Sequence, residues 1–170
     1  MKDMQQDSER LISELKLLRQ HIAALEREKR LQAEIGQEKA RIEHSLRERI
    51  KELNCLYGVV ELIERHSGSI EKILQGIADL LPVSWQYPEI TCARVVFEGN
   101  EYATANFSTS KWKQTAEIIL AGKNVGTVEV YYLKERPDLD EGPFLKEERL
   151  LIDAVAEHIS KAAERIQIEH

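Results

Sequence analysis

Residues 11–25 read LISELKLLRQHIAAL, and this stretch decides the fold of the first third of the chain. Its apolar residues recur at alternating steps of four and three, which places them in one stripe along a helix. The stripe consists of Leu11, Leu15, Leu18, Ile22 and Leu25. Because alternating steps of four and three form the heptad repeat, the stretch predicts a coiled coil whose seam is this stripe.

Charged residues beside the stripe favour a parallel homodimer. With Leu15 at an a position, Glu14 lies opposite Arg19 of a partner helix, and His21 lies opposite Glu26. Exposed pairs of this kind contribute only a few tenths of a kcal/mol, roughly. They therefore indicate the orientation of the two helices more than they stabilise the dimer.

The same register returns later at Leu46, Ile50 and Leu53, which we predict to belong to the same dimer seam. Between the two apolar blocks, the a and d positions hold Lys29, Gln32, Gly36, Lys39 and Glu43. These residues pack poorly against a partner, so the section could allow the helices to slide or rotate. The alternative is a hairpin bend near Gly36. We favour a continuous helix, because one glycine costs a helix only about 1 kcal/mol.

Composition excludes several classes of partner. The formal net charge is -6 and no run of lysine and arginine stands out, so we expect no nucleic-acid partner. No apolar stretch approaches the roughly 18 residues of a membrane-spanning helix, so we expect no membrane insertion. The polar start lacks the apolar core of a signal peptide, which favours a cytoplasmic location.

Residues after the coiled coil predict an α+β domain. We expect a helix after Ser69, then four extended segments at 90–97, 101–107, 112–120 and 125–133, then a helix beginning near Phe144. The last helix carries a stripe that we assign to the dimer seam, namely Ile152, Val155 and Ile159. The order predicts an antiparallel sheet with helices on one side. The predicted organisation is a coiled-coil helix at 8–53, a domain at 54–166 and a tail at 167–170.

Aromatic residues gather in the predicted sheet and its approach. The sharper hypothesis is a pocket for an apolar ligand or haem, formed by Trp85, Tyr87, Cys92, Tyr102 and Trp112. The plainer interpretation is that a small domain uses its few aromatics as core, and we favour it. Cys55 and Cys92 lack the spacing of a zinc site or a disulfide framework, which predicts buried free thiols.

Several motifs together resemble a GAF domain, a sensory module of multidomain histidine kinases and diguanylate cyclases. The resemblance covers 46–166 and rests on the incoming helix, on Val125-Gly126-Thr127-Val128-Glu129-Val130, and on the closing helix from Phe144 to Ile159. Residues 53–58 and 85–90 also look like a GAF-like sensor segment. The resemblance implies a dimer in which first and last helices bundle together. Ligand-binding members carry a long insertion where Phe107 to Trp112 is short, so the resemblance does not predict a cyclic-nucleotide or tetrapyrrole pocket.

The sequence contains no phosphate loop, zinc-protease motif or nucleophile elbow, so we expect no catalytic residues and no cofactor. We expect a non-enzymatic signal-transduction module, a dimeric sensor or transducer that acts on a downstream kinase, cyclase or other protein. One alternative is an oligomerisation adaptor that binds a partner protein and no small molecule. A second is a haem- or redox-responsive sensor that uses Cys55 or Cys92.

Overall fold

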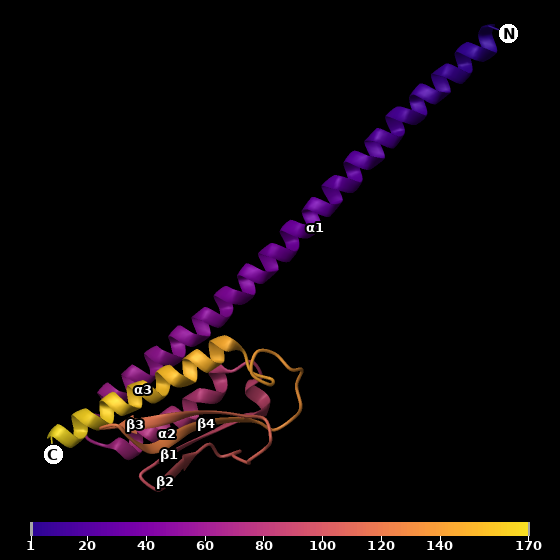
Figure 1. Cartoon of the computed structure of the whole chain (residues 1–170). Coiled ribbons are helices and arrows are strands. Elements are labelled where there is room, and N and C mark those ends of the chain that lie inside the picture. The colour runs from indigo at the N-terminus through magenta and orange to yellow at the C-terminus, as the bar shows by residue number, and fades with distance from the viewer. Residues whose placement is uncertain (1, 170) are drawn as a thin grey trace. The chain divides into compact units, whose positions relative to one another are not determined.

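The computed structural model describes residues 2–169 and has the predicted α+β composition. The order is α1 (Lys2–Arg65), α2 (Ile70–Leu80), the 3-10 turns η1 (Leu81–Ser84) and η2 (Pro88–Ile90), β1 (Thr91–Phe97), β2 (Asn100–Ala103), β3 (Lys113–Leu120), β4 (Lys123–Tyr132) and α3 (Lys146–Glu169) (Figure 1). The chain divides into two compact units, 1–46 and 47–170. The boundary falls within α1, ahead of the predicted one at residue 53.

The first unit is helical throughout its described part. Helix α1 begins at Lys2, ahead of the predicted start at Ser8, and it passes through Gly36 without interruption. The continuous helix is therefore confirmed, and the alternative of a hairpin near Gly36 is wrong. Every described side chain of this unit is exposed. Residues 2–46 bury nothing within a single chain, so their apolar side chains all face solvent.

The second unit contains one four-stranded antiparallel sheet in the order β2-β1-β4-β3. Two tight hairpin turns connect β1 to β2 and β3 to β4. Glu98 and Gly99 form one, Ala121 and Gly122 the other, and all four residues have positive φ. Such turns match the right-handed twist of the strands they join. The hairpin after β3 turns at Ala121 and Gly122, between the predicted segments 112–120 and 125–133, and Lys123 already belongs to β4.

The second strand is shorter than predicted. We expected it to extend from Glu101 to Phe107, but β2 ends at Ala103. The Thr104 amide still donates to the carbonyl of Ala93 in β1, but residues 105–112 leave the ladder. The Phe107 amide donates to the Thr104 carbonyl in a local turn, and the Asn106 side chain donates to the carbonyl of Thr91. The apolar Phe107 was predicted to belong to the strand, but its ring packs against Tyr131 of β4 on the second face of the sheet.

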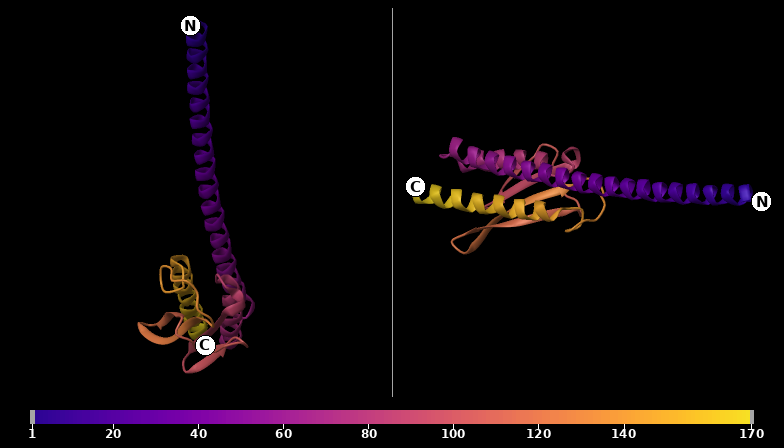
Figure 2. Two further views of the ribbon diagram at one scale, coloured as in Figure 1. Left: turned by 90° about the vertical axis from the view of Figure 1, so that its right-hand side faces the viewer. Right: turned by 90° about the horizontal axis from the view of Figure 1, so that it is seen from above.

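One face of the sheet and three helices enclose the core. Alternate strand residues point to this face, and they share the core with side chains of α2, α3 and the last turns of α1. The strand residues are Ala93, Val95, Phe97, Gln114, Ala116, Ile118, Leu120, Val128, Val130 and Tyr132. The last part of α1 and helix α3 lie side by side (Figure 2). This arrangement confirms the predicted antiparallel sheet with its helices on one side.

Helix α3 turns its apolar stripe inward. Ile152, Val155 and Ile159 have no exposed surface within a single chain. Their assignment to the dimer seam is wrong, because the sheet of their own chain already covers them. An apolar stripe with steps of three and four serves a sheet as well as a partner helix, so the sequence pattern could not distinguish the two. Helix α3 also includes residues 167–169, for which we predicted a tail.

The opposite face of the sheet is covered where β1 and β4 pair. Glu129 and Tyr131 point to it, and they are only 7% and 4% exposed. The segment 104–112 crosses this face, and the Phe107 ring meets the Tyr131 ring edge-on with 5.5 Å between centroids. The guanidinium of Arg94 lies 4.8 Å from the centroid of the same Phe107 ring. Over β1 and β4 the second face is therefore a covered polar layer, whereas Glu117 and Ile119 of β3 stay exposed.

Candidate functional site

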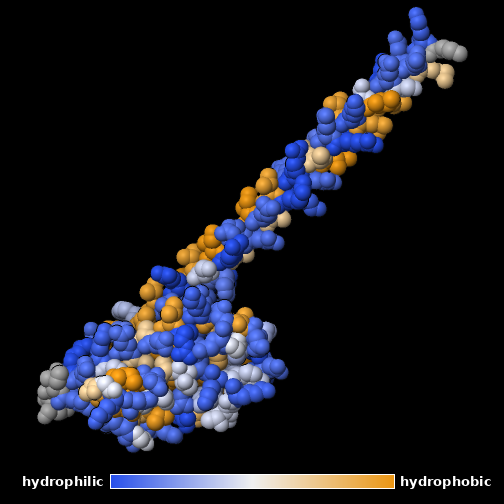
Figure 3. Space-filling view, in the orientation of Figure 1, coloured by the Kyte–Doolittle hydropathy of each residue, from blue (hydrophilic) through white to orange (hydrophobic). Residues whose placement is uncertain are grey.

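The seam residues of the first unit lie exposed along α1. Their side chains are exposed to between 52% and 59%: Leu11, Leu15, Leu18, Ile22 and Leu25. Apolar patches recur along this helix in the space-filling view (Figure 3). Monomeric proteins rarely leave a long, regularly spaced apolar row in solvent. Leu46, the first residue of the later block, is exposed to the same degree, at 56%.

In the second unit, α1 has two apolar faces. Cys55 and Val59 are buried and pack into the core, whereas Ile50 and Leu53 are 55% and 59% exposed. Tyr57, in the same register as Leu53, is 72% exposed. The core therefore occupies one face of this segment, and the residues predicted for the later seam occupy another face that the chain itself leaves open.

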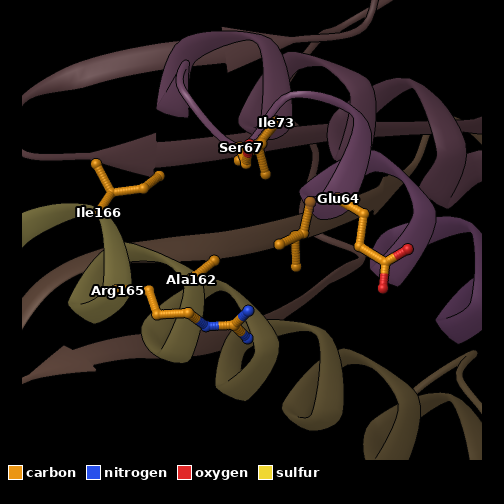
Figure 4. Close-up of a pocket in the computed structure, with 7 residues that line it drawn as sticks. Glu64, Ser67, Ile73, Ala162, Arg165 and Ile166 are labelled. Carbon is orange, nitrogen blue, oxygen red and sulfur yellow. The ribbon is translucent and has the colours of Figure 1, made fainter. Parts of the chain in front are cut away.

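A groove opens where α1 ends beside α3. We call it the helix-end groove; its lining residues are Ile63, Glu64, Ser67, Ile73, Ala162, Arg165 and Ile166 (Figure 4). Its volume is about 230 Å³. The floor is apolar, with Ile73 and Ala162 buried, while Glu64 and Arg165 are exposed at the rim. This chemistry suits an apolar side chain or a small amphiphile.

Sequence reasoning did not assign the helix-end groove. Ile63 lies near the end of α1 and Ile166 near the end of α3, far apart in the sequence. The one pattern that could have indicated a groove is an apolar stripe that continues beyond the end of the neighbouring helix. Such a stripe does not identify which elements meet there.

The five residues of the predicted aromatic pocket are not brought to one cavity. Trp85 is fully buried and donates from Nε1 to Oε1 of Gln114 at 3.2 Å. Tyr87, Tyr102 and Trp112 are partly buried against the same core. Cys92 points to the opposite sheet face, where its thiol donates to the carbonyl of Ser108 at 3.4 Å. None of the five lines the helix-end groove. The haem interpretation remains a prediction.

Both cysteines are free and buried, as predicted. Burial raises the pKa of the Cys55 thiol, although a hydrogen bond with Ser84 acts in the opposite direction. Burial also raises the pKa of Cys92, against the effect of the hydrogen bond to Ser108. Because the thiolate is the reactive form, both shifts disfavour rapid chemistry at these sulfurs.

A polar network occupies the covered second face of the sheet. Glu129 accepts hydrogen bonds from Arg94, Thr127 and Tyr131. Burial alone would raise the pKa of Glu129, but these bonds outweigh it and the pKa is lowered. For Tyr131, burial and its bond to Glu129 raise the pKa to about 12. The network keeps the Glu129 carboxylate ionised, and each polar group around it has a hydrogen-bond partner. Such a fully bonded network is typical of one that stabilises the fold.

A second buried carboxylate joins α3 to the segment before β1. Glu148 is 2% exposed and accepts from the backbone amides of Gln86 and Leu145 at 3.0 and 2.8 Å. The bond from Leu145 closes the first turn of α3 in the manner of a capping box. Burial raises the pKa of Glu148 despite these bonds, and the nearby charge of Glu48 adds to the shift.

None of the helices described over residues 2–169 combines the length and the apolar composition that a membrane crossing requires. The described part of the chain also brings together no group of three or more His, Cys, Asp or Glu side chains that could hold a metal ion. Comparisons of the chain with protein-family models, curated proteins and solved structures find no match.

Proposed function

We propose that this chain is a non-enzymatic signal-transduction module that dimerises through a parallel coiled coil of its first unit. In this proposal the second unit is a GAF-like sensor or transducer domain. It passes a conformational change along α1, the helix that belongs to both units. The downstream partner would be a kinase, a cyclase or another protein that reads the state of the coiled coil.

The observation that carries the proposal is the exposed heptad row of Leu11, Leu15, Leu18, Ile22 and Leu25. A long helix without a partner is marginal in water, because most of its stability normally comes from packing an apolar face. In the described structure, this face packs against nothing in its own chain. A second copy supplies the same row, and the pairs Glu14 with Arg19 and His21 with Glu26 fit a parallel alignment.

Dimerisation is tested by Leu18→Glu with Leu17→Glu as its matched control. The two leucines are neighbours with similar exposure, 58% and 65%, but only Leu18 lies in the seam. We expect Leu18→Glu to convert the dimer to a monomer at about 10 µM protein in sedimentation equilibrium, because each partner would place a charge in the seam. Leu17→Glu should remain a dimer. A wild-type monomer, or equal effects of both variants, would overturn the proposed dimer.

Orientation is tested by Ile22→Cys under mild oxidation. In a parallel dimer the two copies of residue 22 lie opposite each other, close enough for a disulfide. The native thiols at Cys55 and Cys92 are buried and should not compete. We expect a covalent dimer on a non-reducing gel, whereas His21→Cys, one position outside the seam, should cross-link much less. The reverse ranking would argue against a parallel dimer in this register.

Transmission through α1 rests on the polar section between the two apolar blocks. Lys29 and Lys39 at a and d positions weaken the seam, so a change of register there costs little. Replacing Gln32 and Lys39, both at d positions, with leucine should raise the melting temperature of the dimer and hold one register. Spin labels at residues 22 and 50 would then show one inter-helix distance each, where the wild type shows a broader distribution. Unchanged distributions would argue against transmission by re-registration.

The adaptor alternative differs from the sensor in what its second unit binds. A screen of small molecules by thermal shift separates the two, because a ligand that binds only the folded state raises the melting temperature. Saturable stabilisation by a small molecule that is lost on Ala162→Trp, which fills the helix-end groove, would favour the sensor.

A further inference from the structure

We propose that the free edge of β3, with the groove between that edge and α3, binds an extended segment of a partner protein that carries basic side chains. This site is independent of the coiled coil. It lies wholly within the second unit, and it rests on the direction of the backbone groups of β3 and on the charge around them.

Hydrogen bonds at the start of β3 show which of its backbone groups face outward. The carbonyl of Trp112 accepts from the Tyr132 amide, so residue 112 faces β4. The carbonyl of Thr115 instead accepts from Nη1 of Arg149 at 2.7 Å, so residue 115 faces away from β4. Backbone groups alternate along a strand, and the outward set therefore continues at Glu117 and Ile119.

The strand stays regular over this outward set. Its register with β4 shifts between Ile118 and Ile119, which pair with Gly126 and Asn124. The skipped residue, Val125, belongs to β4, so the irregularity does not interrupt the alternation on β3. An incoming strand would thus meet evenly spaced amide and carbonyl groups at Glu117 and Ile119.

The two edges of the sheet are protected to different degrees. Edge strand β2 has only four residues, and the side chain of Gln75 already donates to the carbonyl of Ala103 at 3.0 Å. Edge strand β3 has eight residues and no proline. Proteins normally shorten, cover or interrupt an edge that must not pair. Among residues 2–169, the edge of β3 receives only the Arg149 contact at Thr115, so it is the edge that is open to an added strand.

The groove beside this edge has small side chains at its floor and carboxylates at its rim. Its lining includes Ala116, Ala156 and Ser160, whose small side chains leave space, and the carboxylates Glu117, Asp153 and Glu157. Its volume is about 310 Å³. Side chains from alternate positions of an added strand would enter this space, since they point to one face of the sheet.

Charge decides between a basic partner and a second copy. Asp153 and Glu157 pair with Arg149 and Lys161 in exposed ion pairs at 3.0 and 3.3 Å, and Glu117 makes no ion pair with any described residue. Antiparallel pairing of two β3 edges about Glu117 would bring like charges directly opposite each other, which is destabilising. Lysine or arginine side chains on the added strand would instead meet these carboxylates.

The test measures binding of two fluorescein-labelled, end-blocked peptides, Lys-Thr-Lys-Thr-Lys-Thr and Glu-Thr-Glu-Thr-Glu-Thr, to the whole chain by fluorescence polarisation. The lysine peptide should bind saturably, and the glutamate peptide should bind at least about tenfold more weakly. The same difference should persist in Leu18→Glu, because the site does not need the coiled coil.

Two variants test the backbone edge and the charge separately. Glu117→Pro removes an amide that points away from β4, so it should spare the sheet and weaken lysine-peptide binding at least about tenfold. Glu117→Gln keeps that amide and separates the loss of charge from the loss of the donor. Asp153→Lys with Glu157→Lys should reverse the preference between the peptides, whereas Glu164→Lys, on α3 outside the groove, should not.

Three results with the peptides would overturn the proposal. They are no saturation by the lysine peptide up to about 1 mM, equal binding of both peptides, and unchanged binding to a folded Glu117→Pro variant. Self-association of Leu18→Glu that Glu117→Pro abolishes would also overturn it, because the edge would then serve a second copy. If Glu117→Pro does not fold, the charge-reversal pair decides alone.

Discussion

Arg94 and Glu129 face each other across β1 and β4 and form a two-point ion pair, with Nη2 to Oε1 at 2.8 Å and Nε to Oε2 at 3.3 Å. Their side chains are only 20% and 9% exposed. The pair lies beneath the ring of Phe107 in the covered layer of the sheet. A charged pair so enclosed is costly to break from one side.

Loss of Arg94 should therefore destabilise the second unit. Arg94→Met leaves Glu129 buried without its cation, and we expect the free energy of unfolding to fall by roughly 2–4 kcal/mol. The double variant Arg94→Met with Glu129→Leu should recover most of this loss, because neither charge remains. Urea unfolding measures both. Lys134→Met, at an exposed cation, serves as the control, and a loss as large as that of Arg94→Met would contradict the interpretation.

Glu129 and Glu148 should give opposite pH dependences. The pKa of Glu129 is lowered in the folded state, so its contribution to stability is present at neutral pH and is lost as the pH falls below about 4. The pKa of Glu148 is raised, so the folded state holds its proton more tightly and stability falls as the pH rises above about 4. The stability of Glu148→Gln relative to the wild type should thus increase as the pH rises. The stability of Glu129→Gln relative to the wild type should decrease.

Unfolding free energies at several pH values between about 3 and 7 measure the two differences. Each variant is compared with the wild type at the same pH, so a constant cost of the substitution cancels. Parallel pH profiles for the wild type and both variants would show that neither carboxylate is perturbed.

Ile152 and Leu150 test whether α3 faces its own sheet. Ile152 has no exposed surface, whereas Leu150, two residues earlier, is 56% exposed. Ile152→Ala should cost about 2–5 kcal/mol of unfolding free energy, and Leu150→Ala should cost well under that. Neither should change the mass of the oligomer in sedimentation. If Ile152→Ala dissociated the dimer without loss of stability, Ile152 would instead belong to the dimer seam.

Gly126 and Gly36 should respond to alanine in opposite directions. A Cβ at Gly126 would meet the backbone carbonyl oxygen of Val96, and neither strand can yield without breaking their ladder. Gly126→Ala should therefore destabilise the protein by at least roughly 2 kcal/mol. At Gly36 a Cβ has open space, so Gly36→Ala should stabilise the helix by about 1 kcal/mol. Circular dichroism during thermal unfolding follows both variants.

The candidate surfaces differ in how far the sequence reveals them. The seam from Leu11 to Leu25 is a local repeat, so each member can be identified from its neighbours alone. The helix-end groove needs Ile63 and Ile166, and the groove between the edge of β3 and α3 needs Glu117 and Glu157. The two residues of each pair lie far apart in the chain. No local pattern indicates that such segments meet. Cys92 shows the same limit, because an alternation can predict that it is buried but not on which face.

The sequence by itself determined the long helix, its heptad row, the second helix after Ser69 and most of the four strands, because propensity and periodicity act between residues close in the chain. Tertiary structure alone decided that Ile152, Val155 and Ile159 face their own sheet, since a stripe has the same spacing whatever covers it. It also decided that Glu129 lies in a covered layer, because the segment that carries Phe107 closes over it from elsewhere in the chain.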